Sequence, residues 1–283
     1  MVTTADSNAV DQTQEYVLGT GQDELERLAF QHRLWSDAAH AAWRAARIQI
    51  GHRVLDVGCG PGYASFDLAQ LVTRVGSVVG IDESANFIGN LNQQAQVRGL
   101  TQLRGEVGDV QRIPEFLTHE TPFDLAYCRW VLCFVPDPAA VIQGIAQMLR
   151  PGGRLVIHDY FHYESLTMAP KHPIHDRAVQ ATIASWRQRG GNTDVAGDLP
   201  RILKDAGLLL VSLQTHARVA RPGETMFQWP QVWWRIFAPK MVKMGFMAET
   251  ECRELLELMD RIAASDTHFI QCPLVYEFIA EKK

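Results

Sequence analysis

Apolar and polar positions alternate along this chain with two different periods. Short apolar runs of four to eight residues are typical of buried strands, and apolar residues three or four positions apart are typical of helices. The runs predict strands at 52–57, 77–81, 103–107, 123–128, 153–158, 208–219 and 268–281. Helical spacing predicts helices between them at 62–74, 84–98 and 138–149. This alternation indicates an α/β fold with a doubly wound, mostly parallel sheet of seven strands.

The N-terminal region has a different pattern. Residues 1 to about 15 are polar and predict a tail, and a helical apolar stripe runs from about 22 to 48. The segment 20–23 resembles a capping box at the start of that helix. The helix could form a lid over a binding site or cover one edge of the sheet. In the first case Tyr16, His32 and Trp35 would face the bound molecule.

Two stretches interrupt the strand–helix repeat. One, near 160–199, contains a predicted helix, and the other, at 222–267, is rich in tryptophan and methionine. Trp229, Trp233 and Met241 in the second stretch could line a substrate pocket, form the core of a helical subdomain or form a homodimer interface. The expected organisation is a tail and lid at 1–48, a cofactor-binding core at 49–221, a helical pocket insertion at 222–267 and a final strand at 268–283.

A glycine-rich turn follows the first predicted strand. The segment VLDVGCGPG at 54–62 joins an apolar run and Asp56 to three glycines in five positions, Gly58, Gly60 and Gly62. Such a turn suits backbone with positive φ and close approach of a ligand, at the N-terminus of the next helix. The third glycine comes one position earlier than in a dinucleotide fingerprint, and Pro61 removes a backbone N–H from the turn. The pattern favours a nucleoside ligand without phosphates.

Acidic residues end the next two strands. Asp82, with Glu83 beside it, lies 22 residues after Gly60 and could accept hydrogen bonds from ribose hydroxyls. After the third strand, Asp109 could bind an adenine amino group and Val110 could contact the ring. These residues would meet the glycine turn at the carboxyl edge of a parallel sheet.

At these positions the chain resembles the class I S-adenosylmethionine-dependent methyltransferases, in particular those of small-molecule, natural-product type. The matching elements are DVGCGPG at 56–62, Asp82, Asp109 and the LRPGG turn at 149–153. The resemblance implies a Rossmann-like methyltransferase fold whose last two strands pair antiparallel. It also implies S-adenosyl-L-methionine as cofactor and in-line methyl transfer to an oxygen, nitrogen or carbon of a small aromatic or apolar metabolite. A nicotinamide-dependent oxidoreductase and a non-catalytic regulatory adenosylmethionine-binding protein remain alternatives.

Candidate polar residues also end the fourth and fifth strands. Cys128 and Arg129 would contact the cofactor, and Arg129 could instead anchor an acceptor carboxylate or hold a loop by an ion pair. His158 is a candidate general base, with Tyr160 beside it, because an imidazole titrates near neutral pH. A hydrogen-bonded structural role is the alternative for His158.

Charge and cysteine content argue against some kinds of partner and indicate the compartment. The net charge of −5 argues against a nucleic-acid surface. No apolar run predicts a signal peptide or a membrane helix. Five cysteines without Cys-x-x-Cys spacing indicate reduced thiols and a cytoplasmic protein. The histidines and aspartates between 158 and 176 have no spacing that fixes a ligand geometry, so no metal is expected.

Overall fold

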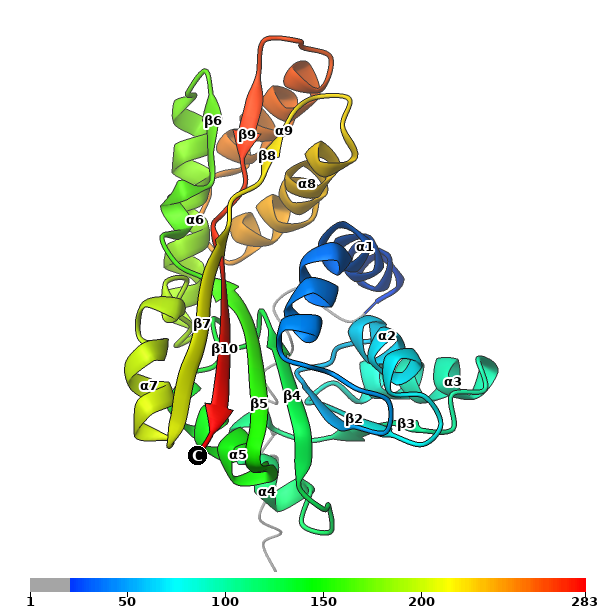
Figure 1. Ribbon diagram of the computed structural model, residues 1–283. Coiled ribbons are helices and arrows are strands. Elements are labelled where there is room, and N and C mark those ends of the chain that lie inside the picture. Colours follow the sequence, from blue (N-terminus) through cyan, green and yellow to red (C-terminus); the bar gives the residue numbers. More distant parts are fainter. Residues whose placement is uncertain (1–20) are drawn as a thin grey trace, which may run out of the picture.

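The computed structural model describes residues 21–283, and a seven-stranded sheet runs through its centre (Figure 1). The strand order is β3-β2-β1-β4-β5-β10-β7. The strands are β1 (Arg53–Val57), β2 (Ser77–Asp82), β3 (Leu103–Val107), β4 (Phe123–Arg129), β5 (Leu149–Tyr160), β7 (Leu208–His216) and β10 (Val275–Lys282). The first five are parallel, and β10 is antiparallel to both β5 and β7. The predicted doubly wound sheet and the antiparallel pairing of its last two strands are confirmed.

Helices cover both faces of this sheet. They are α1 (Gln22–Ala45), α2 (Tyr63–Val72), α3 (Ala85–Val97), α4 (Ile113–Phe116), α5 (Pro138–Met148), α6 (Pro173–Gln188), α7 (Leu199–Asp205), α8 (Gln228–Lys243) and α9 (Glu249–Ala263). Neighbouring strand residues point to opposite faces, so Val54 joins a core with α1, α2 and α3 while Leu55 joins a core with α5 and α7. The apolar runs of the parallel strands are buried on both sides for this reason.

The N-terminal helix differs in detail from the expectation. It begins after Gly21, which has no side chain to cap it, so the expected capping box does not form. Tyr16, which was expected with His32 and Trp35 to face a bound molecule, lies outside the described residues. The helix ends at Ala45, three residues before the expected boundary, because the chain turns there through Arg47 with φ of 61°.

A second, three-stranded sheet was not predicted. It consists of β6 (Thr167–Ala169), β9 (Phe269–Gln271) and β8 (Val219–Ala220), all antiparallel. The expected strands at 208–219 and 268–281 are therefore each divided between two sheets. In the second case the break contains Pro273, which has no N–H for a ladder. Figure 1 shows this sheet with α6, α8 and α9 beyond the carboxyl ends of the parallel strands.

The helical insertions belong to the same hydrophobic core as the large sheet. Trp234, Phe237 and Met241 of α8 and Leu255 of α9 are fully buried and continuous with the core over β4 and β5. Trp229 is also buried, with 7% of its surface exposed. Trp229 and Met241, which could have formed a homodimer interface, are thus covered within the chain, and Trp233 is partly buried.

Candidate functional site

A cavity of about 310 Å³ lies at the carboxyl ends of the parallel strands, with α1 and α8 on its other side. Its wall has two chemically different parts. The carboxylate half, beside β1, β2 and β3, contains Asp56, Asp82, Glu83 and Asp109. The aromatic half, beside β4, β5 and the insertions, contains Trp130, Phe134, Tyr160, Tyr163, Trp186, Trp229 and Trp233.

The glycine turn supplies part of the wall of the carboxylate half. All three glycines have positive φ, which side chains other than glycine rarely adopt. A Cβ at Gly58 would lie 2.3 Å from Val131 Cγ2, and one at Gly62 would lie 2.6 Å from Leu91 Cγ. A Cβ at Gly60 would meet no atom within 4 Å, and Gly60 lines the cavity. Gly58 and Gly62 therefore allow the turn to pack, and Gly60 leaves room for a ligand.

The carboxylates are held in place by short hydrogen bonds. Asp82 Oδ2 accepts from the Gly60 N–H at 2.8 Å, and Oδ1 accepts from the Ser84 N–H at 2.9 Å. Asp56 accepts from the Ser65 hydroxyl at 2.5 Å, and burial raises the pKa of Asp56 to about 6. Burial and the neighbouring acids Asp82 and Asp109 raise the pKa of Glu83. A ligand with hydroxyl or ammonium donors would relieve this crowding of negative charge.

Asp109 has a comparable arrangement at the end of β3. Its Oδ1 caps a short 3-10 helix by accepting from the Gln111 N–H at 2.9 Å. Val110, the next residue, is buried and lines the cavity. The pair therefore presents an acceptor and an apolar surface side by side.

A hydrogen-bonded chain connects Arg129 at the end of β4 to the N-terminal helix α1. Arg129 Nη2 lies 3.0 Å from His32 Nδ1, and His32 Nε2 lies 3.0 Å from Asp67 Oδ2. The other guanidinium nitrogen, Arg129 Nη1, is buried and has no hydrogen-bond partner among the described residues. Since Arg129 lines the cavity, an anionic group of a ligand could satisfy this nitrogen.

The aromatic half is a continuous cluster of rings. Trp130 stacks on Tyr160 and on Trp229 with centroids 6.0 Å apart in each case. Tyr160 lies 5.1 Å from Tyr163, which lies 5.4 Å from Trp186. These distances are typical of favourable aromatic pairs. The cluster therefore lines this half of the cavity with packed aromatic rings.

The polar groups of the aromatic half are mainly donors. The indole nitrogens of Trp130, Trp186 and Trp233 are buried without partners among the described residues. The Tyr160 and Tyr163 hydroxyls also make no hydrogen bond within the described part of the chain, and burial raises the pKa of both phenols well above 10. These hydroxyls keep their protons at neutral pH and can donate them to a ligand oxygen.

The structure brings most of the predicted site residues to this cavity. They are His32, Asp56, Gly58, Gly60, Asp82, Glu83, Asp109, Val110, Arg129, Tyr160, Trp229 and Trp233. Gly62, Cys128, Trp35 and Met241 do not line it. Trp35 and Met241 are buried beneath the wall, where Met241 Sδ lies 3.6 Å from the Thr182 hydroxyl.

His158 is not positioned as a general base. Its ring is 2% exposed and does not line the cavity, because β5 directs it to the face of the sheet covered by α1. Its Nε2 lies 3.2 Å from Glu277 Oε2, and its Nδ1 lies 3.4 Å from the Tyr127 hydroxyl. Burial lowers the pKa of His158. The hydrogen-bonded structural alternative describes this residue, and the prediction of a base at His158 is corrected.

The cavity wall also contains Arg27, Phe134, Tyr163 and Trp186, which were not predicted from the sequence. Arg27 on α1 is buried and paired with Glu24 at the edge of the aromatic half. The helical pattern around Trp186 was visible in the sequence, but nothing in it indicates that α6 folds back beside β5. Tyr163 follows the end of β5 and could have been named as an extension of that strand end.

Known proteins similar to this chain in sequence include methyltransferases. Residues 48–216, more than half of the chain, match the model of the methyltransferase domain family. A demethylmenaquinone methyltransferase of Oceanobacillus iheyensis is 32% identical over 122 residues, covering 41% of this chain and 50% of the relative. A ubiquinone biosynthesis O-methyltransferase of Xanthomonas oryzae pv. oryzae is 32% identical over 150 residues, covering 48% and 60%. The chain spans about half the length of the curated relatives it matches.

Solved structures confirm the fold independently. A geranyl diphosphate methyltransferase in complex with S-adenosylmethionine superimposes with a TM-score of 0.55 at 18% identity, covering 94% of both chains. The protein therefore belongs to the methyltransferase domain family, within the S-adenosylmethionine-dependent class that its motifs resemble. Between residues 21 and 283, each helix is too short or too polar to cross a lipid bilayer.

Proposed function

We propose that this protein transfers the methyl group of S-adenosylmethionine to a small aromatic acceptor. The observation that carries the proposal is the division of one cavity into a carboxylate half and an aromatic half. The first half suits a nucleoside with hydroxyl and ammonium donors, and the second suits a flat apolar molecule. Their junction at Arg129 and Trp130 is where the two ligands would meet.

The residues of the carboxylate half fit the cofactor. Asp82 would accept from the ribose hydroxyls, and the free space over Gly60 admits the nucleoside. Asp109 would accept from the adenine amino group while Val110 contacts the ring. Arg129 Nη1, which has no partner in residues 21–283, would bind the carboxylate of the amino-acid tail, and Asp56 lines the same cavity for its ammonium group.

The aromatic half favours an acceptor with oxygen acceptors on a ring. All four carboxylates of the cavity wall lie in the other half, and the aromatic half offers phenol hydroxyls and the indole N–H groups of Trp130, Trp186 and Trp233, which have no partner among the described residues. A hydroxylated aromatic ring or its phenolate would satisfy these donors. The curated relatives are named for demethylmenaquinone and ubiquinone biosynthesis, which agrees with this class.

Methyl transfer mainly requires the protein to position the cofactor and the acceptor. Bound S-adenosylmethionine supplies an activated methyl group on a sulfonium. The ring cluster would hold the acceptor atom in line with that group and exclude water. The Tyr160 and Tyr163 hydroxyls retain their protons, so they would orient the acceptor oxygen and stabilise its anionic form rather than remove a proton.

Mass spectrometry tests the acceptor class directly. Purified protein with S-adenosylmethionine and a panel of hydroxylated aromatics should yield products heavier by one methyl group. The variants Tyr160→Phe and Tyr163→Phe should lower kcat/KM for the acceptor by about three- to tenfold, the usual cost of one lost hydrogen bond. Tyr276→Phe is the matched control, since that tyrosine does not line the cavity. Transfer to aliphatic acceptors alone would refute the proposed substrate class.

We also propose a cytoplasmic protein with a small-molecule partner and no nucleic-acid partner. All five cysteines are free, and each is buried without a disulfide. The net charge of −5 opposes binding to a phosphate backbone. Retention of labelled DNA or RNA by the protein at moderate salt would contradict this part of the proposal.

A further inference from the structure

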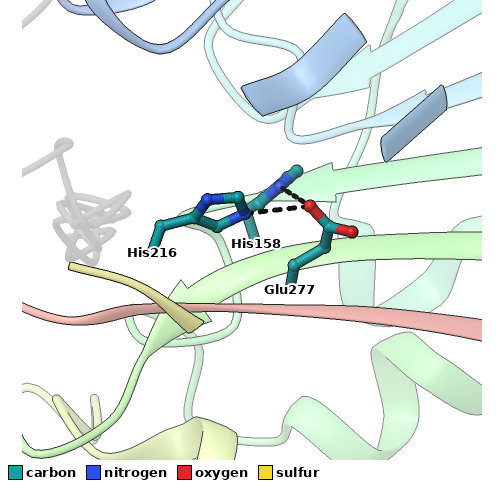
Figure 2. A group of neighbouring side chains, drawn as sticks. All are labelled: His158, His216 and Glu277. Atoms are coloured by element: carbon teal, nitrogen blue, oxygen red, sulfur yellow. Dashed lines mark hydrogen bonds and ion pairs between the residues drawn. The ribbon is translucent and has the colours of Figure 1, made fainter. Parts of the chain in front are cut away.

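Three polar side chains meet on the large sheet, outside the cavity. Glu277 lies on β10, the strand between β5 and β7, and its carboxylate faces His158 of β5 and His216 of β7 (Figure 2). Glu277 Oε2 is 3.2 Å from His158 Nε2 and 2.9 Å from His216 Nε2. The three candidate ligand atoms lie within 4.8 Å of one another. Two imidazole nitrogens and one carboxylate oxygen thus converge on one point.

The strand register explains the convergence. Glu277 is paired directly with His158 across β10 and β5. His216 is paired with Val275, two residues from Glu277 on the same strand. Residues two apart on a strand share a face of the sheet. All three side chains therefore point toward α1, whose Trp35 ring lies 6.3 Å from the His216 ring.

We propose that His158, His216 and Glu277 bind a divalent first-row transition-metal ion such as Zn²⁺. Two imidazoles and a carboxylate are a donor set that such ions prefer. Bonds of about 2.0–2.2 Å in tetrahedral geometry separate ligand atoms by roughly 3.3–3.6 Å. The nitrogen–oxygen distances of 3.2 and 2.9 Å are slightly below this spacing, and all three ligand atoms lie within 4.8 Å of one another, so a small shift of the side chains would bring them to it. An ion would take the place of the two Nε2 protons that point at Glu277 Oε2, and each neutral imidazole would then carry its one proton on Nδ1.

The surroundings suit both states of the cluster. The Tyr127 hydroxyl, 3.4 Å from His158 Nδ1, can donate to that nitrogen or accept from it. His158 can therefore carry its single proton on Nδ1 when Nε2 binds an ion, and Tyr127 holds the ring in orientation. The His216 side chain is 21% exposed, which gives an ion and a bound water a route to the cluster.

The ion would have a structural role. None of the three residues lines the cavity. The site instead joins β5, β10 and the edge strand β7, which are held together elsewhere by sheet hydrogen bonds and packing. This inference does not depend on the proposed methyl transfer, and its test uses no activity.

Calorimetric titration of untagged, metal-free protein with Zn²⁺ tests the site. We expect binding of one ion per chain, weakened at least about tenfold in His216→Ala and in Glu277→Gln. His216 is partly exposed on an edge strand and Glu277→Gln keeps the side-chain shape, so both variants should fold, as circular dichroism would verify. His119→Ala, which removes an exposed imidazole far from the cluster in sequence, should bind as the unchanged protein does.

Cobalt gives a second readout. Co²⁺ added to the metal-free protein should produce visible absorption of a four- or five-coordinate ion, and His216→Ala should lose it. Absence of Zn²⁺ binding by the unchanged protein would overturn the proposal. Equal Zn²⁺ affinity in His216→Ala, Glu277→Gln and the unchanged protein would also overturn it, because the ion would then bind elsewhere.

Discussion

Replacing Gly58 and Gly60 separately by alanine should have different consequences, mainly for stability in the first case and mainly for ligand binding in the second. Both residues have left-handed backbone, with φ of 62° and 53°, and this conformation costs an alanine about 1–2 kcal/mol. At position 58 the new Cβ would also overlap Val131, whose Cγ2 is only 2.3 Å away. Overpacking of this kind costs about 1–3 kcal/mol more. Gly58→Ala should therefore lower the free energy of unfolding by about 2–5 kcal/mol.

Gly60→Ala should mainly affect ligand binding. Its Cβ meets no protein atom within 4 Å and would occupy the space over the turn that we assign to the cofactor. The free energy of unfolding should fall only by the backbone cost of about 1–2 kcal/mol. Affinity for S-adenosylhomocysteine should fall about tenfold or more, as expected when a close backbone approach is blocked.

Denaturant unfolding and calorimetry measure the two effects. A double-mutant cycle with Val131→Ala isolates the overlap at position 58, since that change removes the crowding γ-carbons. The cycle should give a favourable coupling of about 1–3 kcal/mol. Equal destabilisation by the two alanines, with coupling below about 0.5 kcal/mol, would refute the crowding argument. Unchanged ligand affinity in Gly60→Ala would refute the placement of the cofactor over the turn.

Two further predictions concern buried charge. Asp82→Asn puts an amide N–H against the backbone N–H of Gly60 or Ser84. Affinity for S-adenosylhomocysteine should therefore fall ten- to a hundredfold, or about 1.5–3 kcal/mol. A change below about threefold in calorimetry would contradict the ribose assignment. His175 is buried with both ring nitrogens unpartnered among the described residues, and burial lowers its pKa from 6.5 to about 4. The unfolded chain takes up the proton first as pH falls, so the free energy of unfolding should drop by up to about 3 kcal/mol between pH 6.5 and 4. His175→Leu should remove that part of the pH dependence in unfolding experiments, and an unchanged slope would contradict the assignment.

The large sheet could be predicted because the local sequence of each strand indicates that the strand is buried. Runs such as 78–81 and 155–157 have no charged side chain on either face, and charged residues mark their ends. The carboxylate half of the site follows from the same logic, since Asp56, Asp82 and Asp109 lie at or just after strand ends. Local patterns and the parallel topology together bring them to one edge.

The remaining features depend on contacts between distant segments. The split of the last strand at Pro273 follows from pairing of β9 with β6 and β8, which are far away in the sequence. His158 was expected to face the site because it ends a central strand, but the alternation of side chains along β5 turns it toward α1 and Glu277. No local pattern relates residues 158, 216 and 277. The position of Arg27 in the cavity wall likewise could not be predicted, because it depends on how α1 packs against the rest of the chain.

Calorimetric titration of the protein with S-adenosylhomocysteine, with NADH in parallel, tests the central claim most directly. Binding of S-adenosylhomocysteine in the micromolar range, about −8 kcal/mol, with no heat from NADH is the predicted result. Saturable NADH binding without S-adenosylhomocysteine binding, in the presence and absence of the aromatic acceptor panel, would contradict the proposed function and favour a nicotinamide-dependent oxidoreductase.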